Sequence, residues 1–232
     1  MTTDHEMQEF LRPTHYLDAS HPAIVDFVDR VTAGLSSCRD KAVALYDAVR
    51  DGVRYDPSAF GFGDRTFVAS EVLKAGRAFC VPKAILLATA GRAVGIPTRL
   101  GFADVRNHLT SERLTKLMGT DVFAFHGNTG FYLDGRWVKC TPAFNLSLCE
   151  KVGVVPLDFD GRSDSLFHAC DRQGKRHMEY LKDHGDFADF PLDRLIASYR
   201  ETYPALFGRG DKRFIDPNIA GGTFEDEVTV PH

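Results

Sequence analysis

Apolar residues recur at helical spacing through the first third of the chain. A stripe of five between positions 21 and 35 predicts a first helix, with Ser20 as its N-cap. That stripe comprises Ile24, Val25, Phe27, Val28 and Val31. A second stripe begins after Ser37 and predicts a helix that ends near Gly52. It comprises Ala42, Val43, Leu45, Tyr46, Val49 and Val53. Ser70 is placed to cap a short helix over 71–74.

The longest apolar run, 84–90, predicts a further helix that ends before the sequence Gly95-Ile96-Pro97. Its entrance is a glycine-containing loop with Cys80 at the first turn and Pro82 two residues later, where a missing N–H costs little. A thiol at a helix N-terminus faces unpaired backbone N–H groups and the positive end of the helix dipole. Both favour the nucleophilic thiolate, so Cys80 is a candidate nucleophile; the alternative is an ordinary buried cysteine.

After Pro97 the pattern changes to alternation, which predicts strands over 98–105 and 122–133. A polar insert over 106–119, with a short helix around 112–118, separates them. Asp134-Gly135 is a two-residue hairpin signal, and 136–140 is the returning strand. Helices followed by an antiparallel sheet predict an α+β fold, with the Cys80 helix packed on the sheet. We expect one domain over 1–207, without a boundary before about residue 150, and a loosely structured tail over 208–232.

Composition narrows the classes of function. The net charge is −4 and the basic residues do not cluster, which argues against a nucleic-acid or membrane surface. Five cysteines without a Cys-x-x-Cys motif, and no visible secretory signal, favour reduced thiols in the cytoplasm. No glycine-rich phosphate loop or dinucleotide fingerprint occurs, so no nucleotide cofactor is expected. The oligomeric state is left open.

Four local patterns occur in one order between about residues 36 and 145. They are the helix entry Arg77-Ala78-Phe79-Cys80, the helix end over 92–99 (Arg-x-x-Gly-Ile-Pro-x-Arg), His126 on a strand, and the hairpin over 134–138 that ends in Trp-Val. Together they resemble the transglutaminase-like superfamily, whose core follows the papain-like cysteine-enzyme plan. The resemblance implies that Cys80 is the nucleophile and His126 its general base, in a two-step acyl transfer through a thioester. It also implies an amide or peptide substrate, with the backbone N–H of Cys80 as an oxyanion donor.

One position departs from the family pattern. An aspartate that fixes the histidine tautomer usually stands in an Asp-Pro pair after the Trp-Val strand, whereas this chain has Thr141-Pro142. A threonine hydroxyl or carbonyl can accept the imidazole N–H but supplies no charge, and Asn145 is a second candidate to orient the ring. Three interpretations stay open: a neutral third member, a third member from elsewhere, or a weakened site.

Two functions other than catalysis are alternatives for this chain. A scaffold that keeps the fold to bind proteins or peptides would fit the missing aspartate, and a redox-sensing thiol would need a partner such as Cys140 or Cys149. Hydrolysis is at least as well supported as amine crosslinking. The expected site has no metal or organic cofactor, because the spacings of four metal-capable residues match no zinc site and the 158–169 segment lacks the residues of a calcium loop. Those four are His168, Cys170, His177 and His184. Tyr55 and Trp137 are interpreted as core or groove-wall residues.

Overall fold

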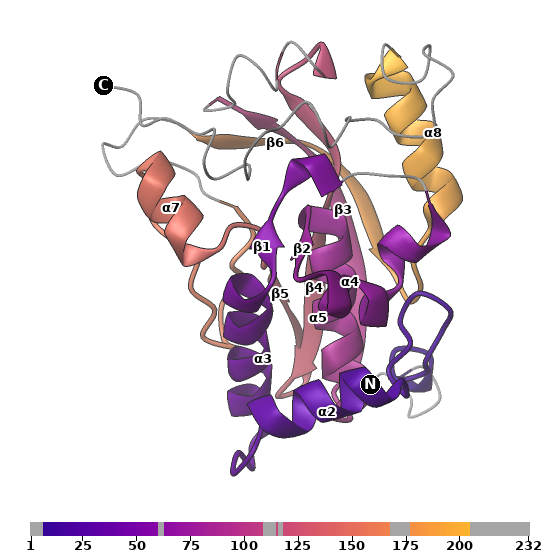
Figure 1. The fold of residues 1–232 in the computed structure, drawn as a ribbon, viewed down its shortest axis with the longest axis vertical. Helices are drawn as coiled ribbons and strands as arrows, with labels where there is room; N and C mark the ends of the chain where they lie inside the picture. Colours follow the sequence, from indigo (N-terminus) through magenta and orange to yellow (C-terminus); the bar gives the residue numbers. More distant parts are fainter. Residues whose placement is uncertain (1–6, 60–62, 109–114, 116–117, 168–176, 205–232) are drawn as a thin grey trace.

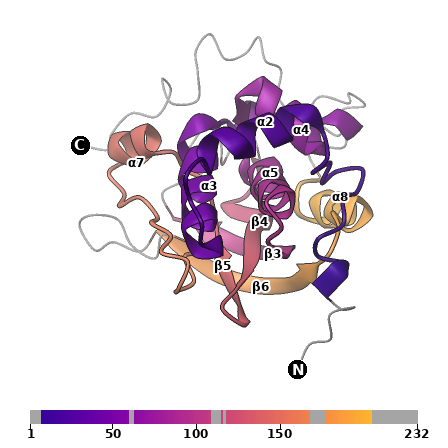
Figure 2. The same ribbon diagram turned by 90° about the horizontal axis from the view of Figure 1, so that it is seen from below.

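The computed structural model describes residues 7–59, 63–108, 115, 118–167 and 177–204. Its main sheet has four antiparallel strands in the order β5-β4-β3-β6, and helices cover one face (Figures 1 and 2). The strands are β3 (Thr98–Asn107), β4 (Val122–Leu133), β5 (Arg136–Cys140) and β6 (Met178–Phe187). The predicted α+β fold is therefore confirmed, with a helix that begins at Cys80 packed on the sheet.

That helix, α5 (Cys80–Ala93), is the centre of the molecule. Every residue except the last is buried, as expected for a helix that is apolar all round. It packs on β4 and is surrounded by three further helices on its other sides (Figure 2). They are α2 (Pro22–Val31), α3 (Cys38–Gly52) and α4 (Ala69–Ala75).

Close packing between α5 and the sheet depends on small residues. A Cβ on Gly91 would lie 2.5 Å from Cγ2 of Thr98 and 2.7 Å from the Phe131 ring. The hydroxyl of Thr129 on β4 donates to the carbonyl of Ala84 on α5, at 2.8 Å. Side chains of the sheet therefore lie directly against the α5 backbone, which sets how closely the helix approaches the sheet.

Two buried charged side chains of α5 join it to neighbouring segments. The Nζ of Lys83, which is fully buried, donates to the carbonyls of Arg50 (2.8 Å) and Val53 at the end of α3. The guanidinium of Arg92 donates to the carbonyls of Arg12 and Thr98. Lysine and arginine suit these positions because helix and loop ends leave carbonyls without donors.

Apart from the helix predicted around 112–118, the predicted elements of the first 140 residues are confirmed, with corrections at their ends. The N-cap of α2 is His21, whose Nδ1 accepts from the N–H of Ala23, and Ser20 is not the cap. Val25, predicted to face inward, is 39 % exposed. The residue before α4 is Val68, and Ser70 lies inside that helix with its N–H on Asp18.

The chain beyond residue 145 adds elements that the sequence pattern did not indicate. These are α7 (Leu146–Val152), the sheet strand β6 and α8 (Leu192–Thr202), which contacts β4 on the side of α5 away from α3 (Figure 1). The predicted tail over 208–232 and most of the predicted helix over 112–118 lie outside the described residues. Among the described helices, none has the length and apolar character needed to cross a lipid bilayer.

Candidate active site

The entrance to α5 is held in place by a short parallel sheet. After α4 ends with Gly76 in the left-handed region, strand β2 (Arg77–Ala78) pairs with β1 (Arg54–Tyr55). The N–H of Arg54 donates to the carbonyl of Gly76, and that of Asp56 to Ala78, both at 3.0 Å. The helix then begins at Cys80, so a rigid connection on both sides places the thiol at the predicted position.

Three backbone N–H groups lie near the sulfur of Cys80 and act to lower the pKa of the thiol. Two belong to the first turn of α5, from Cys80 itself and Val81, and the third belongs to Gly127 on β4. Hydrogen bonds from these donors stabilise a thiolate and lower its pKa. Burial has the larger effect, because the side chain is 6 % exposed, and the net result is a pKa raised to about 11. The N–H groups at the helix start therefore act in the expected direction, but burial outweighs them and favours the neutral thiol over a ready thiolate.

His126 stands immediately before Gly127, where β4 passes under the first turn of α5. A Cβ on Gly127 would lie 3.1 Å from the Cα of Val81 and 3.5 Å from the carbonyl oxygen of Cys80. β5 ends at Cys140, which pairs with Thr129 of β4. Gly127 lies two residues beyond this last β4–β5 pair, so its N–H can face the thiol. The structure thus brings the backbone at His126 next to Cys80, and His126 is itself buried.

Three tyrosines lie within electrostatic reach of the thiol. The pKa of each is raised first by burial and in part by the negative charge of an ionised Cys80. Tyr55, from β1, was singled out in the sequence, whereas Tyr199 and Tyr203 come from α8 and its C-cap. The sequence held no signal for the last two, because only the docking of α8 brings them to Cys80. Together they make the surroundings of the thiol aromatic.

Thr141 and Asn145 lie on the segment that leaves β5, and both are buried. The backbone of Thr141 is engaged at both ends: its N–H donates to Ser165 at 2.9 Å, and its carbonyl accepts from the hydroxyl of Tyr46 at 3.3 Å. The Oδ1 of Asn145 accepts the N–H of Tyr55 at 3.0 Å, which ties α7 to β1. Asn145 therefore has a structural task beside the site, and the hydroxyl of Thr141 is the group to test.

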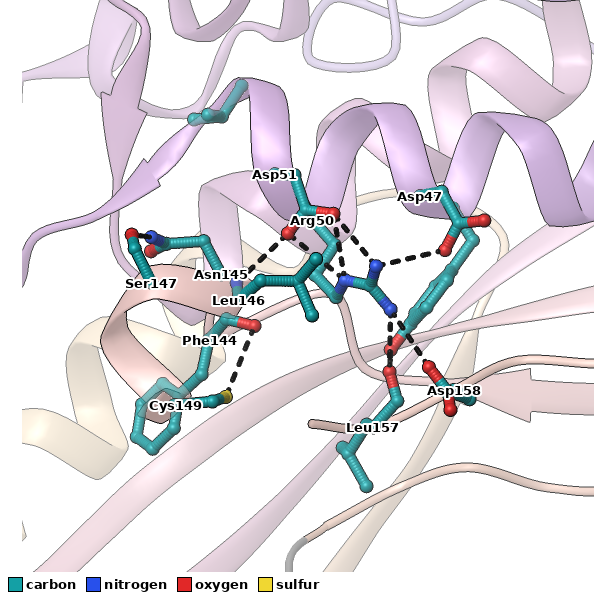
Figure 3. A network of polar contacts seen from close by, with 12 residues as sticks. Asp47, Arg50, Asp51, Phe144, Asn145, Leu146, Ser147, Cys149, Leu157 and Asp158 are labelled. Carbon is teal, nitrogen blue, oxygen red and sulfur yellow. Dashed lines mark hydrogen bonds and ion pairs between the residues drawn. The ribbon is translucent and has the colours of Figure 1, made fainter. Parts of the chain in front are cut away.

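A network centred on Arg50 holds this segment against α3 (Figure 3). The guanidinium pairs with Asp51 at 2.8 Å and donates to the carbonyl of Leu157 at 2.9 Å. Asp51 in turn accepts the N–H of Leu146 at the start of α7, and these contacts lower the pKa of its carboxyl against the opposing effect of burial. One arginine thus anchors both ends of the stretch that follows Thr141.

Trp137 does not lie at the site. It pairs with Tyr132, six residues from His126 along β4, or roughly 20 Å at the usual rise of a strand. Its ring packs against Phe10 and under the guanidinium of Arg99, which is 4.3 Å from the ring centre. The interpretation of Trp137 as a packing residue is consistent with these contacts.

The metal-capable residues are dispersed where they are described. His177 is buried and stacks on Phe144, and His184 bonds to Asp104, while positions 168 and 170 lie outside the described residues. No group of three or more metal-capable side chains occurs in the described part of the chain. The four described cysteines form no disulfide, and positions 140 and 149 are fully buried.

Comparison with known proteins agrees with this architecture. The model of the transglutaminase-like superfamily matches residues 25–142, about half of the chain, and the protein therefore belongs to that superfamily. No match was found among curated proteins. A search of solved structures found a chain from Cytophaga hutchinsonii described as a candidate cysteine protease, at 15 % identity and a TM-score of 0.49.

That alignment covers 77 % of this chain and 64 % of the other, so the protein spans less than two thirds of its structural relative. A second chain, a candidate protease from Parabacteroides distasonis, aligns at 15 % identity with a TM-score of 0.38. It is covered over 24 % of its length, and 57 % of this chain is aligned. Family membership and the fold rest on the superfamily match and on the structure itself.

Proposed function

We propose that this protein carries out cysteine-dependent acyl transfer or hydrolysis at an amide or peptide bond of a protein or peptide substrate. The observation that carries the proposal is the position of Cys80 at the start of α5, packed against β4 at Gly127, the residue next to His126. The chain belongs to the transglutaminase-like superfamily. Its residues at the two family positions, Cys80 and His126, are of the types that the proposed reaction needs. The described cysteines, none in a disulfide, suit a reducing compartment such as the cytoplasm.

The raised pKa of Cys80 assigns a definite task to His126. With a pKa of about 11, only about one thiol in ten thousand is ionised at pH 7, so a base must remove the proton during the reaction. His126 takes that proton as the sulfur attacks the carbonyl carbon. The negative oxygen that forms is stabilised by backbone N–H groups at the start of α5.

Collapse of this intermediate breaks the carbon–nitrogen bond, and the imidazolium returns its proton to the departing amine or ammonia. A thioester on Cys80 remains. Water or a second amine, deprotonated by His126, then attacks the thioester and releases the thiol. Thr141 is the proposed third member, and its hydroxyl would accept the imidazole N–H without adding a charge.

Acetylation by p-nitrophenyl acetate tests the first half of the reaction. We expect one equivalent of p-nitrophenolate to be released quickly, with an acetyl group on the Cys80 peptide by mass spectrometry. Cys80→Ala should abolish this burst and His126→Ala should slow it by about a hundredfold or more. Cys149→Ala is the matched control, since it removes another buried thiol and should leave the burst unchanged.

The second half requires an amide. Casein is offered with and without a fluorescent primary amine, and the release of new amino groups is compared with incorporation of the label. Peptide release without incorporation would define a hydrolase, and incorporation would define an acyltransferase. Absence of both, and of Cys80 acetylation, would contradict an enzyme.

A binding scaffold is the second candidate, favoured by the neutral, buried thiol and by Thr141 in place of aspartate. Under this alternative Cys80 stays unacetylated at pH 7–9. Cys38 also opens a helix, α3, but is exposed, and it should react with iodoacetamide in the same sample. Labelling of Cys38 with an inert Cys80 would favour the scaffold.

A further inference from the structure

The strand that carries His126 is irregular immediately before that residue. One residue of β3, Asp104, stands opposite two residues of β4, Ala124 and Phe125, which is a β-bulge. Because side chains alternate along a strand, one extra residue reverses the facing of everything that follows it. The bulge therefore determines which way His126 leaves the strand.

The bulge needs support from outside β4. Phe125 has φ = +55°, a left-handed conformation that is unfavourable for a bulky side chain and persists only where the surroundings impose it. Its N–H donates to Oδ1 of Asp104 at 2.9 Å, and the N–H of Ala124 donates to the hydroxyl of Tyr203 at 2.7 Å. The two N–H groups at the bulge are thus taken by side chains from β3 and from the end of α8.

The same oxygen of Asp104 has a second partner. Nε2 of His184 lies 2.7 Å from it, and the His184 ring packs on Phe125 with 4.7 Å between ring centres. His184 is itself an extra residue in β6, next to Gly185 at φ = +88°. A second bulge on the opposite edge of β3 therefore aims an imidazole at the carboxylate that holds the first.

We propose that Asp104, held by His184, is a positioning residue for His126. This role rests on the proposed function, in which His126 is the base. The carboxylate fixes the Phe125 N–H, that bond fixes the bulge, and the bulge sets the direction of the histidine that follows. This chain has Thr141 where the family has the aspartate that orients the histidine ring. Asp104 on β3 would orient His126 instead, by fixing the backbone of β4.

The test is a cycle of variants in the p-nitrophenyl acetate assay. We expect Asp104→Ala to acetylate Cys80 about a hundredfold more slowly at pH 7, as misplacement of a catalytic group does. In a His126→Ala background the same change should slow the reaction by no more than about twofold, because there is no base left to position. Equal losses in both backgrounds would overturn the proposal and make Asp104 a general stability residue.

A pH series separates positioning from loss of folding. If only the base is misplaced, the ratio of wild-type to Asp104→Ala rates should shrink steadily from pH 7 to pH 10, as hydroxide ionises more of the thiol. A constant ratio would contradict the proposal. His126→Ala acting as fast as wild type would instead overturn the proposed function, and this role with it.

Two further variants cover the case in which Asp104→Ala fails to fold. Asp104→Asn keeps an oxygen for the Phe125 N–H and should recover most of the acetylation rate. His184→Phe should lower that rate about tenfold in the protein that keeps His126, and not in the His126→Ala variant. Failure of Asp104→Asn to rescue would contradict the hydrogen-bond mechanism. Asp183→Asn is the matched control: Asp183 neighbours His184, is exposed and bonds the Gly185 N–H, and its amide should leave the rate unchanged.

Discussion

Removal of one hydroxyl, in Tyr46→Phe, tests how the segment beyond β5 is held. Tyr46 is fully buried on α3, and its hydroxyl donates to the carbonyls of Leu157 at 2.7 Å and Thr141 at 3.3 Å. Phenylalanine keeps the ring and its packing, so the change isolates the hydrogen bonds. The carbonyl of Leu157 keeps its bond from Arg50, whereas that of Thr141 loses the hydroxyl.

The magnitude follows from that difference. An exchanged hydrogen bond contributes about 1 kcal/mol, and a buried acceptor left without a donor costs about 1–3 kcal/mol. We expect Tyr46→Phe to lower the free energy of unfolding by about 1–2 kcal/mol. In a domain of this size that corresponds to a fall in Tm of roughly 2–8 °C.

Urea unfolding followed by the fluorescence of the single tryptophan measures this loss. Tyr180→Phe is the matched control, because that ring is 39 % exposed on β6 and its change should cost under about 0.5 kcal/mol. If the two variants proved equally stable, the hydroxyl of Tyr46 would not be holding the segment. A slower Cys80 acetylation in Tyr46→Phe alone would further link the position of Thr141 to catalysis.

Three other outcomes follow from the structure. Gly185→Ala should destabilise the protein by about 1–2 kcal/mol in thermal unfolding, since φ = +88° excludes an ordinary side chain; an unchanged Tm would contradict this. Arg92→Met should cost about 3 kcal/mol or more, because the carbonyls of Arg12 and Thr98 lose buried charged donors, and a neutral effect in urea would refute that account. Raising the pH should also destabilise the fold: Cys80 ionises near pH 9 when unfolded but near 11 when folded, so its contribution is complete below pH 9 and about 2–3 kcal/mol is lost between these values. Unfolding free energies that stay flat from pH 8 to pH 10.5 would show that the thiol is not buried as described.

Local signals account for the elements that the sequence predicted. Ser37 caps α3 through a bond to the N–H of Asp40, and Gly95 follows α5 with positive φ. Asp134 and Gly135 both have positive φ at the β4–β5 turn, as a two-residue hairpin requires. Each signal acts within a few residues of the element it ends or begins, so no knowledge of the tertiary structure was needed.

β6 shows why the remainder could not be predicted. Of its ten residues only Met178 is buried, so the strand lacks an apolar alternation, and its two register shifts break the period further. An edge strand with charged side chains is well suited to avoid pairing with other molecules, but that same composition conceals it in the sequence. Its existence depends on β3, whose residues pair with positions 71 to 87 residues later in the chain, from Asn107 with Met178 to Leu100 with Phe187.

The candidate active site likewise has a part that the sequence predicted and a part that it could not predict. The sequence placed Cys80 at a helix start and identified the N–H donors there, both of which the structure contains. Burial of the thiol depends on how the rest of the chain packs around it, and it outweighs the effect of those donors on the thiol pKa. Local chemistry could therefore be predicted from the motif, whereas the protonation state required the whole fold. The catalytic roles of Cys80, His126 and Thr141 stay predictions.

The order of the sheet also bears on synthesis. β3 lies between β4 and β6, yet β6 is the last of the described strands to leave the ribosome, long after the superfamily-matched segment is complete. Until then one edge of β3 has no partner and Asp104 has no His184 beside it. A nascent chain stopped near residue 145 should therefore be prone to self-association through that edge. Tyr199 and Tyr203, which lie within electrostatic reach of Cys80, would join its surroundings only when translation of α8 is finished.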